Sequence, residues 1–172
     1  MKLLLKVASI FIILIGISQL LLSYFGFHAY KEMFETLESF QPTLVSSLSD
    51  WDIVWMVRDF WILGIASVLA GVVVFWKNNL SWSFFVAVCL IHTIQSIISL
   101  FKFHLGNEVE LDPSLADFQP LLIAYWLIPM IVSLTGIISA LKLKDHFLPM
   151  GEKKWYFLAI FSTLLISLIF IF

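Results

Sequence analysis

Residues 57–101 read VRDFWILGIASVLAGVVVFWKNNLSWSFFVAVCLIHTIQSIISLF. This stretch holds two apolar runs, Val57–Trp76 and Trp82–Phe101, separated only by the short polar segment Lys77–Ser81. Each run is close to the roughly 20 helical residues that cross a hydrocarbon core about 30 Å thick. Neither run alternates apolar and polar residues, as the strands of a membrane β-barrel do. The stretch therefore predicts two adjacent, antiparallel transmembrane helices.

Three more apolar runs of similar length lie outside this stretch, at Leu3–Tyr24, Leu121–Leu141 and Trp155–Phe172. The composition agrees with a membrane protein, because 61% of the residues are hydrophobic and 13% are charged, against about 25% charged in soluble domains. We expect an all-α, polytopic bundle forming a single domain over residues 1–172. Its five transmembrane helices are expected at about 3–24, 57–76, 82–101, 121–141 and 155–172.

The charged residues predict the orientation of the chain, because basic segments stay on the cytoplasmic side. The N-terminus and the second and fourth gaps hold Lys2, Lys6, Lys77, Lys142, Lys144, Lys153 and Lys154, with only Asp145 and Glu152 as acids. The first and third gaps hold Glu32, Glu35, Glu38, Asp50, Asp52, Glu108, Glu110, Asp112 and Asp117. The pattern predicts a cytoplasmic N-terminus and an extracytoplasmic C-terminus, in the cytoplasmic membrane of a bacterium.

The first apolar run could also be a cleaved signal peptide, since basic residues precede it. A signal peptide has an apolar region of about 7–15 residues followed by a small-residue cleavage site. The apolar stretch from Val7 to Phe27 is longer, and Ser23–Ala29 offers no good cleavage pair. We expect this helix to be retained; cleavage would leave four spans.

The first outer segment contains a possible short amphipathic helix, Tyr30–Phe40. Its apolar residues recur at helical spacing, with glutamates between them. The simplest interpretation is a helix lying on the bundle or among the lipid head groups. A docking surface for a partner, or a lid, is the alternative.

Tryptophan and tyrosine should gather at the two membrane interfaces. Trp76 and Trp82 are expected at the inner interface, and Trp51 and Trp55 near the outer one. Small residues should instead mediate contacts between helices. Such stripes comprise Ser9, Gly16 and Ser23 on the first helix, Gly64, Ser67 and Gly71 on the second, and Ser133, Gly136 and Ala140 on the fourth.

The third helix carries an unusual polar face. Cys89, His92, Ser96 and Ser99 follow a 3–4–3 spacing, which places them on one side of a helix. His92 would lie about 16 Å from Ser81 along the helix, near the middle of the membrane. Ionisable groups at that depth are costly and often mark functional sites. A neutral histidine that hydrogen-bonds a serine or a carbonyl on a neighbouring helix, and so only fixes packing, is the competing interpretation.

Polar residues on four helices share one depth, in the predicted outer half. Gln19, Gln95 and Tyr125 lie roughly 6–9 Å inside the outer ends of their helices. Arg58 and Asp59 stand at the outer rim of the second helix. We predict a ligand-binding pocket formed by His92, Gln95, Arg58, Gln19, Tyr125 and Asp59, with His92 as its floor.

Two residues near this pocket have alternative interpretations. Arg58 either extends to the head groups, with Asp52 and Trp55 as its best-placed neighbours, or points inward and binds a carboxylate or phosphate. Pro129 removes one backbone hydrogen bond from the fourth helix. It is expected to kink or loosen that helix, as a structural feature or as part of a gate.

The sequence shows no catalytic set and no metal or haem motif such as HExxH or CxxCH. We therefore expect no enzyme activity, no catalytic residues, no metal and no cofactor, and the short basic loops exclude a nucleic-acid platform. The one argument for a bound haem or metal is that His28 and His104 each follow the outer end of a helix by a few residues, where Glu108 or Glu110 could join them as ligands.

The predicted function is binding or transport of a small or lipidic ligand. The alternative is a non-catalytic membrane subunit, assembly factor or immunity-type protein. Membrane lipids are the expected partners, and transport would need a homo-oligomer or a larger membrane complex.

Overall fold

The computed structural model describes residues 2–40, 49–76, 78–105, 119–144 and 161. Its elements are the helices α1 (Lys2–Phe40), α3 (Asp50–Met56), α4 (Arg58–Val73), α5 (Asn79–Leu105) and α6 (Gln119–Lys142), and the 3₁₀ turn η1 (Val74–Trp76). Within the described ranges, four stretches are long and apolar enough to cross a membrane: Lys2–Leu37, Arg58–Trp76, Asn79–Phe101 and Ile123–Lys142. The described residues confirm the prediction of a helical chain with several helices long and apolar enough to cross a membrane. The predicted fifth span, Trp155–Phe172, lies outside the described residues except for Phe161.

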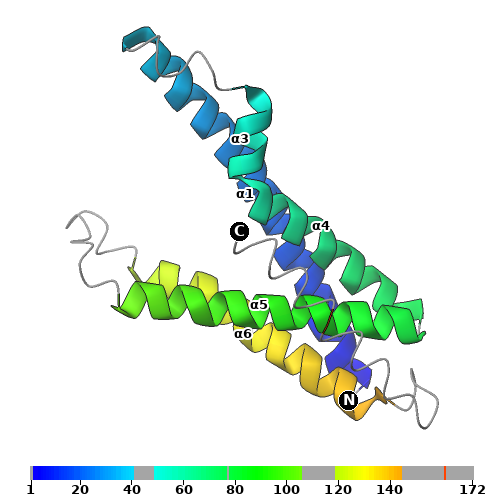
Figure 1. Cartoon of the computed structure of the whole chain (residues 1–172). Helices are drawn as coiled ribbons and strands as arrows, with labels where there is room; N and C mark the ends of the chain where they lie inside the picture. Colours follow the sequence, from blue (N-terminus) through cyan, green and yellow to red (C-terminus); the bar gives the residue numbers. More distant parts are fainter. Residues whose placement is uncertain (1, 41–48, 77, 106–118, 145–160, 162–172) are drawn as a thin grey trace.

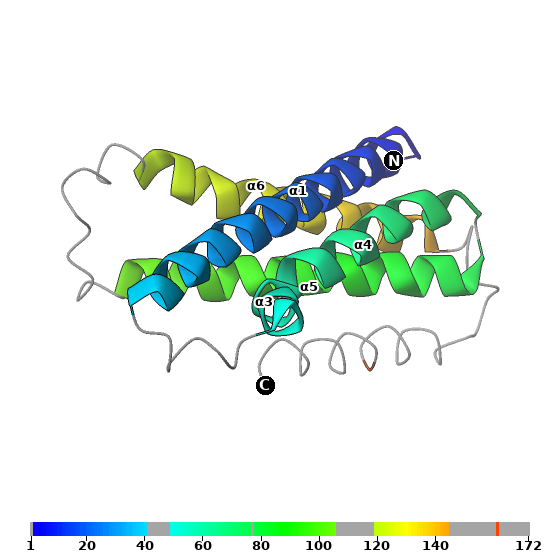
Figure 2. The ribbon, with the colours of Figure 1, turned by 90° about the horizontal axis from the view of Figure 1, so that it is seen from above.

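The long helices form two antiparallel pairs. α4 packs mainly along α1, and α5 packs mainly along α6, while α1 also contacts α6 and α4 contacts α5. Figure 1 shows the first pair crossing the second, and the two pairs diverging towards the end where α1 and α3 project. Figure 2 shows the same helices from above, with α5 running beneath the crossing of α1 and α6. The four helices therefore converge at one end and separate at the other.

α1 is a single helix that includes the predicted amphipathic segment, Tyr30–Phe40. The sequence predicted one helix at about 3–24 and a separate one at 30–40, but the structure continues without a break from Lys2 to Phe40. At 1.5 Å per residue, this helix is about 58 Å long, nearly twice the thickness of a hydrocarbon core. The physical reason is local: Phe27–Phe40 contains no proline or glycine, and its Lys, Glu, Met and Leu residues favour helix.

The contact between α1 and α4 is made by small residues, as predicted. A Cβ atom added to Gly16 would lie 2.7 Å from the Gly64 carbonyl oxygen, so only glycine fits at that position. About two turns further along α4, the Ser9 hydroxyl donates a hydrogen bond of 2.6 Å to the Gly71 carbonyl. The backbones therefore approach closely, and the contact includes a polar bond across the helix pair.

Trp82 belongs to the core and not to an interfacial belt. The sequence placed it at the inner interface, but its side chain is 1% exposed. Its indole N–H donates a hydrogen bond of 3.1 Å to the Ala140 carbonyl of α6. The expectation for Trp82 is wrong because α6 covers this position, whereas Trp76, Trp51 and Trp55 are exposed as expected.

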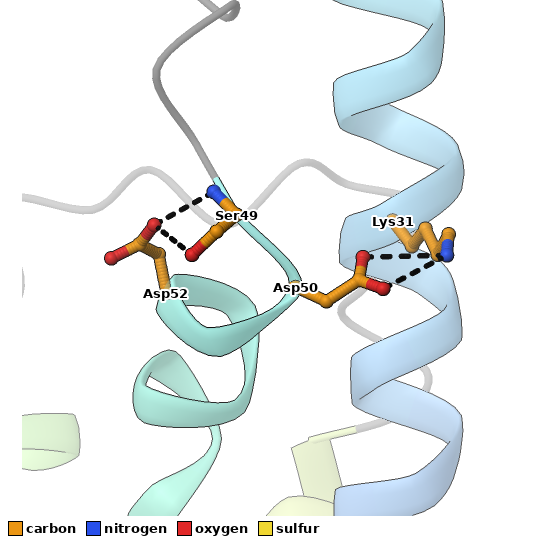
Figure 3. A network of polar contacts seen from close by, with 4 residues as sticks. All are labelled: Lys31, Ser49, Asp50 and Asp52. Atoms are coloured by element: carbon orange, nitrogen blue, oxygen red, sulfur yellow. Dashed lines mark hydrogen bonds and ion pairs between the residues drawn. The ribbon is translucent and has the colours of Figure 1, made fainter.

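The short helix α3 is held against the projecting part of α1. The Lys31 ammonium group lies 3.3 Å from an Asp50 carboxylate oxygen, which links the two helices (Figure 3). At the start of α3, the Ser49 backbone N–H and hydroxyl each donate a hydrogen bond of 2.7 Å to the Asp52 carboxylate. These bonds fix the beginning of the helix, and with it the position of Trp51 and Trp55.

Candidate functional site

A pocket of about 150 Å³ lies between α1, α5 and α6. It is lined by Ile15, Ser18 and Gln19 of α1, by His92, Gln95 and Ser96 of α5, and by Ala124, Tyr125, Trp126, Ile128 and Pro129 of α6. Four of the six predicted site residues, Gln19, His92, Gln95 and Tyr125, therefore line one pocket. Their equal depth in the predicted membrane indicated that these residues lie near one another. In the structure, the rotation of each helix places all four side chains around the same pocket.

Gln19 contributes a buried polar group with unused hydrogen-bonding capacity. Its side chain is 9% exposed, and its amide oxygen Oε1 has no hydrogen-bond partner among the described residues. An unsatisfied buried acceptor costs about 1–3 kcal/mol, so buried polar atoms usually have partners. A group of this kind in a pocket wall can bind a ligand that donates a hydrogen bond.

His92 is fixed by a hydrogen bond to a neighbouring helix. Its Nε2 atom lies 2.7 Å from the Ser67 hydroxyl of α4, and both side chains are buried. Ser67 has a single hydroxyl proton, which it donates to the Leu63 carbonyl at 2.6 Å. When the Ser67 proton is on this carbonyl, the Ser67 oxygen accepts from the His92 tautomer that carries its proton on Nε2, and Nδ1 is then the acceptor of the neutral imidazole.

The polar face of α5 is directed into the bundle. Cys89, His92 and Ser96 are each 2% exposed or less, so the 3–4–3 spacing correctly identified a buried face. Gln95 stands at the edge of that face and is only half-buried. On α6, Tyr125 is also half-buried, and its ring packs edge-on against Trp126 with 4.8 Å between ring centroids.

Pro129 lies within the continuous helix α6 and forms part of the pocket wall. Proline has no backbone N–H, so the carbonyl four residues earlier, that of Tyr125, lacks its usual helical donor. Because Tyr125 also lines the pocket, the missing helical bond lies at the pocket itself. The sequence placed Pro129 near the predicted pocket, and in the structure it forms part of one wall.

Arg58 and Asp59 do not line this pocket. The Arg58 Nε atom lies 3.4 Å from an Asp59 carboxylate oxygen, and its guanidinium carbon lies 5.3 Å from the centre of the Trp55 ring. The expected neighbour Trp55 is correct, whereas the expected contact with Asp52 is wrong, since Asp52 binds Ser49. Depth placed Arg58 and Asp59 with the other polar residues, but these two occupy the junction of α3 and α4.

The sequence indicated only a packing role for Ser67, but in the structure its hydroxyl also contacts Nε2 of the pocket residue His92. A signal was present: Ser67 lies about 14 Å from Trp76, and His92 about 16 Å from Ser81, when both are counted along their helices. The two residues therefore share a depth on helices joined by a short turn. Trp126, which the sequence did not assign to the pocket, is a further lining residue.

Most of the residues considered as ligands of a metal or haem lie outside the described residues. Glu108, Glu110 and the side chain of His104 lie there, while His28 is exposed and packs against Tyr24. In the part of the chain that the structure describes, no group of three His, Cys, Asp or Glu side chains is placed to hold a metal ion. Comparison of the chain with protein-family models, with curated proteins and with solved structures found no match.

Proposed function

We propose that this protein is a multi-pass membrane protein that binds a small or lipid-like ligand in the pocket between α1, α5 and α6. The observation that carries the proposal is Gln19, a residue of the pocket wall whose buried amide oxygen has no partner among the described residues. The other walls supply a fixed imidazole and an aromatic pair. Ligand sites commonly combine mainly apolar walls with a few polar groups that orient the ligand.

The proposed topology has five spans, with a cytoplasmic N-terminus and an extracytoplasmic C-terminus, in the cytoplasmic membrane of a bacterium. The distribution of lysines supports this orientation. The pocket residues lie in the second half of the predicted first span, residues 3–24, at or beyond the middle of α5 and in the first half of α6. In the proposed topology, these positions form the outer half, so a ligand enters from the extracytoplasmic side or from the outer leaflet.

A test compares the small molecules that remain bound after purification. The full chain is extracted in lipid nanodiscs from native membranes, and bound molecules are identified by mass spectrometry. We expect a compound that is enriched with the wild type, lost from Gln19→Leu, and retained by Thr135→Val. Thr135 is a suitable control because its hydroxyl binds the Ile131 carbonyl of its own helix at 2.8 Å and does not line the pocket. Equal contents of all three preparations would refute the proposal.

The second candidate function is a non-catalytic subunit of a membrane complex. The observation in its favour is the outward face of α1, where Val7, Ile10, Leu14, Ile17 and Leu21 are exposed at helical spacing. Such a face suits a partner helix as well as it suits lipid. Co-purification of a second protein in fixed stoichiometry, lost on polar substitution of Leu14, would favour this role.

A further inference from the structure

Residues from three different helices that line the pocket carry hydrogen-bond acceptors. The Gln19 amide oxygen of α1 is buried and has no partner among the described residues. On α5, His92 Nε2 contacts the Ser67 hydroxyl, and in the tautomer that donates to Ser67 the Nδ1 atom is the acceptor of the ring. The Tyr125 carbonyl of α6 lacks its helical donor, because residue 129 is proline.

The character of the walls limits the charge of the occupant. The residues that line the pocket include no Lys, Arg, Asp or Glu in the part of the chain that the structure describes. Burial of an ion in such surroundings, without a counter-charge, is strongly unfavourable. Tyr125, Trp126, Ile128 and Pro129 instead offer aromatic and aliphatic surface, which suits a planar, neutral molecule.

The volume limits the size of the occupant. A cavity of about 150 Å³ matches the engineered apolar cavity of the same size that binds benzene. One six-membered ring with a single small substituent therefore fills the space.

From these observations, we infer that the ligand of this pocket is a neutral, ring-sized molecule or head group that carries an O–H donor. The inference rests on the proposed function and specifies its ligand class. The donor hydrogen-bonds the Gln19 oxygen, with His92 Nδ1 and the Tyr125 carbonyl as further acceptors, while the ring lies against the α6 wall. A donor-bearing ligand thus satisfies acceptors that the chain itself leaves open.

The experiment measures equilibrium binding of phenol and fluorobenzene to the full chain in lipid nanodiscs, with binding to protein-free nanodiscs subtracted. The two probes have the same ring and nearly the same size, but only phenol has a donor. We expect phenol to bind about tenfold more tightly, because fluorobenzene leaves a buried acceptor unpaired. Benzoate, which is charged, should not compete with phenol.

Two variants test the assignment of the acceptors. Gln19→Leu should reduce the preference for phenol to less than about threefold, and Thr135→Val should preserve it. Pro129→Ala provides a second test if Gln19→Leu fails to fold. It restores the N–H that the Tyr125 carbonyl lacks, so the preference should fall there too.

The possible failures are distinguishable. Equal binding of phenol and fluorobenzene above background would refute the donor requirement and leave the proposed pocket intact. A preference for phenol that survives in both Gln19→Leu and Pro129→Ala would refute the acceptor assignment. Absence of specific binding by either probe would overturn this inference together with the proposed function.

Discussion

The Ser67 hydroxyl lies 2.7 Å from His92 Nε2 and joins α4 to α5 inside the bundle. This contact agrees with one of the two interpretations of His92, a bond that fixes the packing of two helices. The same ring lines the pocket, so a role in ligand binding stays a proposal. A structural bond of this kind fixes the orientation of a ring that is proposed to bind a ligand, much as hydrogen bonds orient metal-binding histidines.

Replacing Ser67 by alanine should destabilise the protein by about 1 kcal/mol. The substitution keeps Cβ, and with it the contact with α1, but leaves a buried His92 N–H without an acceptor. The measurement is the thermal unfolding midpoint in detergent, with Thr135→Val as the matched loss of a hydroxyl. An unchanged midpoint for Ser67→Ala would show that this bond contributes nothing to stability.

Replacing Gly16 by alanine should separate α1 from α4 and cost about 1–3 kcal/mol through overpacking. The added Cβ would lie 2.7 Å from the Gly64 carbonyl oxygen. Gly26→Ala is the milder control, because its Cβ would lie 3.3 Å from a methyl carbon of Val57 and not against a backbone oxygen. Similar unfolding midpoints for the two variants would contradict the close approach of the helices at Gly16.

The start of α3 should loosen in acid. The hydroxyl and the backbone N–H of Ser49 donate to the Asp52 carboxylate and hold its pKa below the usual range. A lowered pKa in the folded state stabilises the fold above the ordinary aspartate pKa of about 4. That stabilisation is lost as the pH falls below this value towards the folded-state pKa.

Hydrogen exchange of residues 50–56 measures this effect. We expect the exchange, corrected for its intrinsic pH dependence, to become less protected below about pH 4 in the wild type. Asp52→Asn should show the weaker protection at every pH, whereas Asp50→Asn, which removes only the exposed ion pair to Lys31, should behave like the wild type. A pH response that is the same in all three proteins would exclude Asp52 as its source.

Cysteine labelling tests the proposed orientation. The single native cysteine, Cys89, is fully buried, so the wild type provides a low background. Glu35 on the projecting part of α1 and Lys144 after α6 are both exposed. In intact cells, a membrane-impermeant maleimide should label Glu35→Cys at once and Lys144→Cys only after permeabilisation. The reverse result would invert the topology.

Much of the site was predictable because depth along a helix follows directly from residue number. Gln19, His92, Gln95 and Tyr125 were grouped on that basis, and they line one pocket. Depth does not give the rotation of a helix about its axis, which is why Arg58 and Asp59 were grouped with them. Their true neighbours are set by the junction of α3 and α4, a feature with no hydropathy signal.

The helices were predictable from the sequence within the apolar runs, but less so outside these runs. Hydropathy marked the helical residues inside the expected membrane but not the continuation of α1 to Phe40, since that part is amphipathic. Composition likewise placed Trp82 at an interface, whereas its burial depends on the neighbouring helix α6 and on the Ala140 carbonyl. Tertiary contacts decide whether such a residue is buried, and these contacts cannot be inferred from one sequence alone.

The most direct test of the central claim is an experimental structure of the full chain purified with its native lipids. We predict non-protein density between α1, α5 and α6, within hydrogen-bonding distance of the Gln19 amide and beside the His92 ring. A pocket that is closed by side chains, with the Gln19 oxygen paired to another residue of the chain, would contradict it.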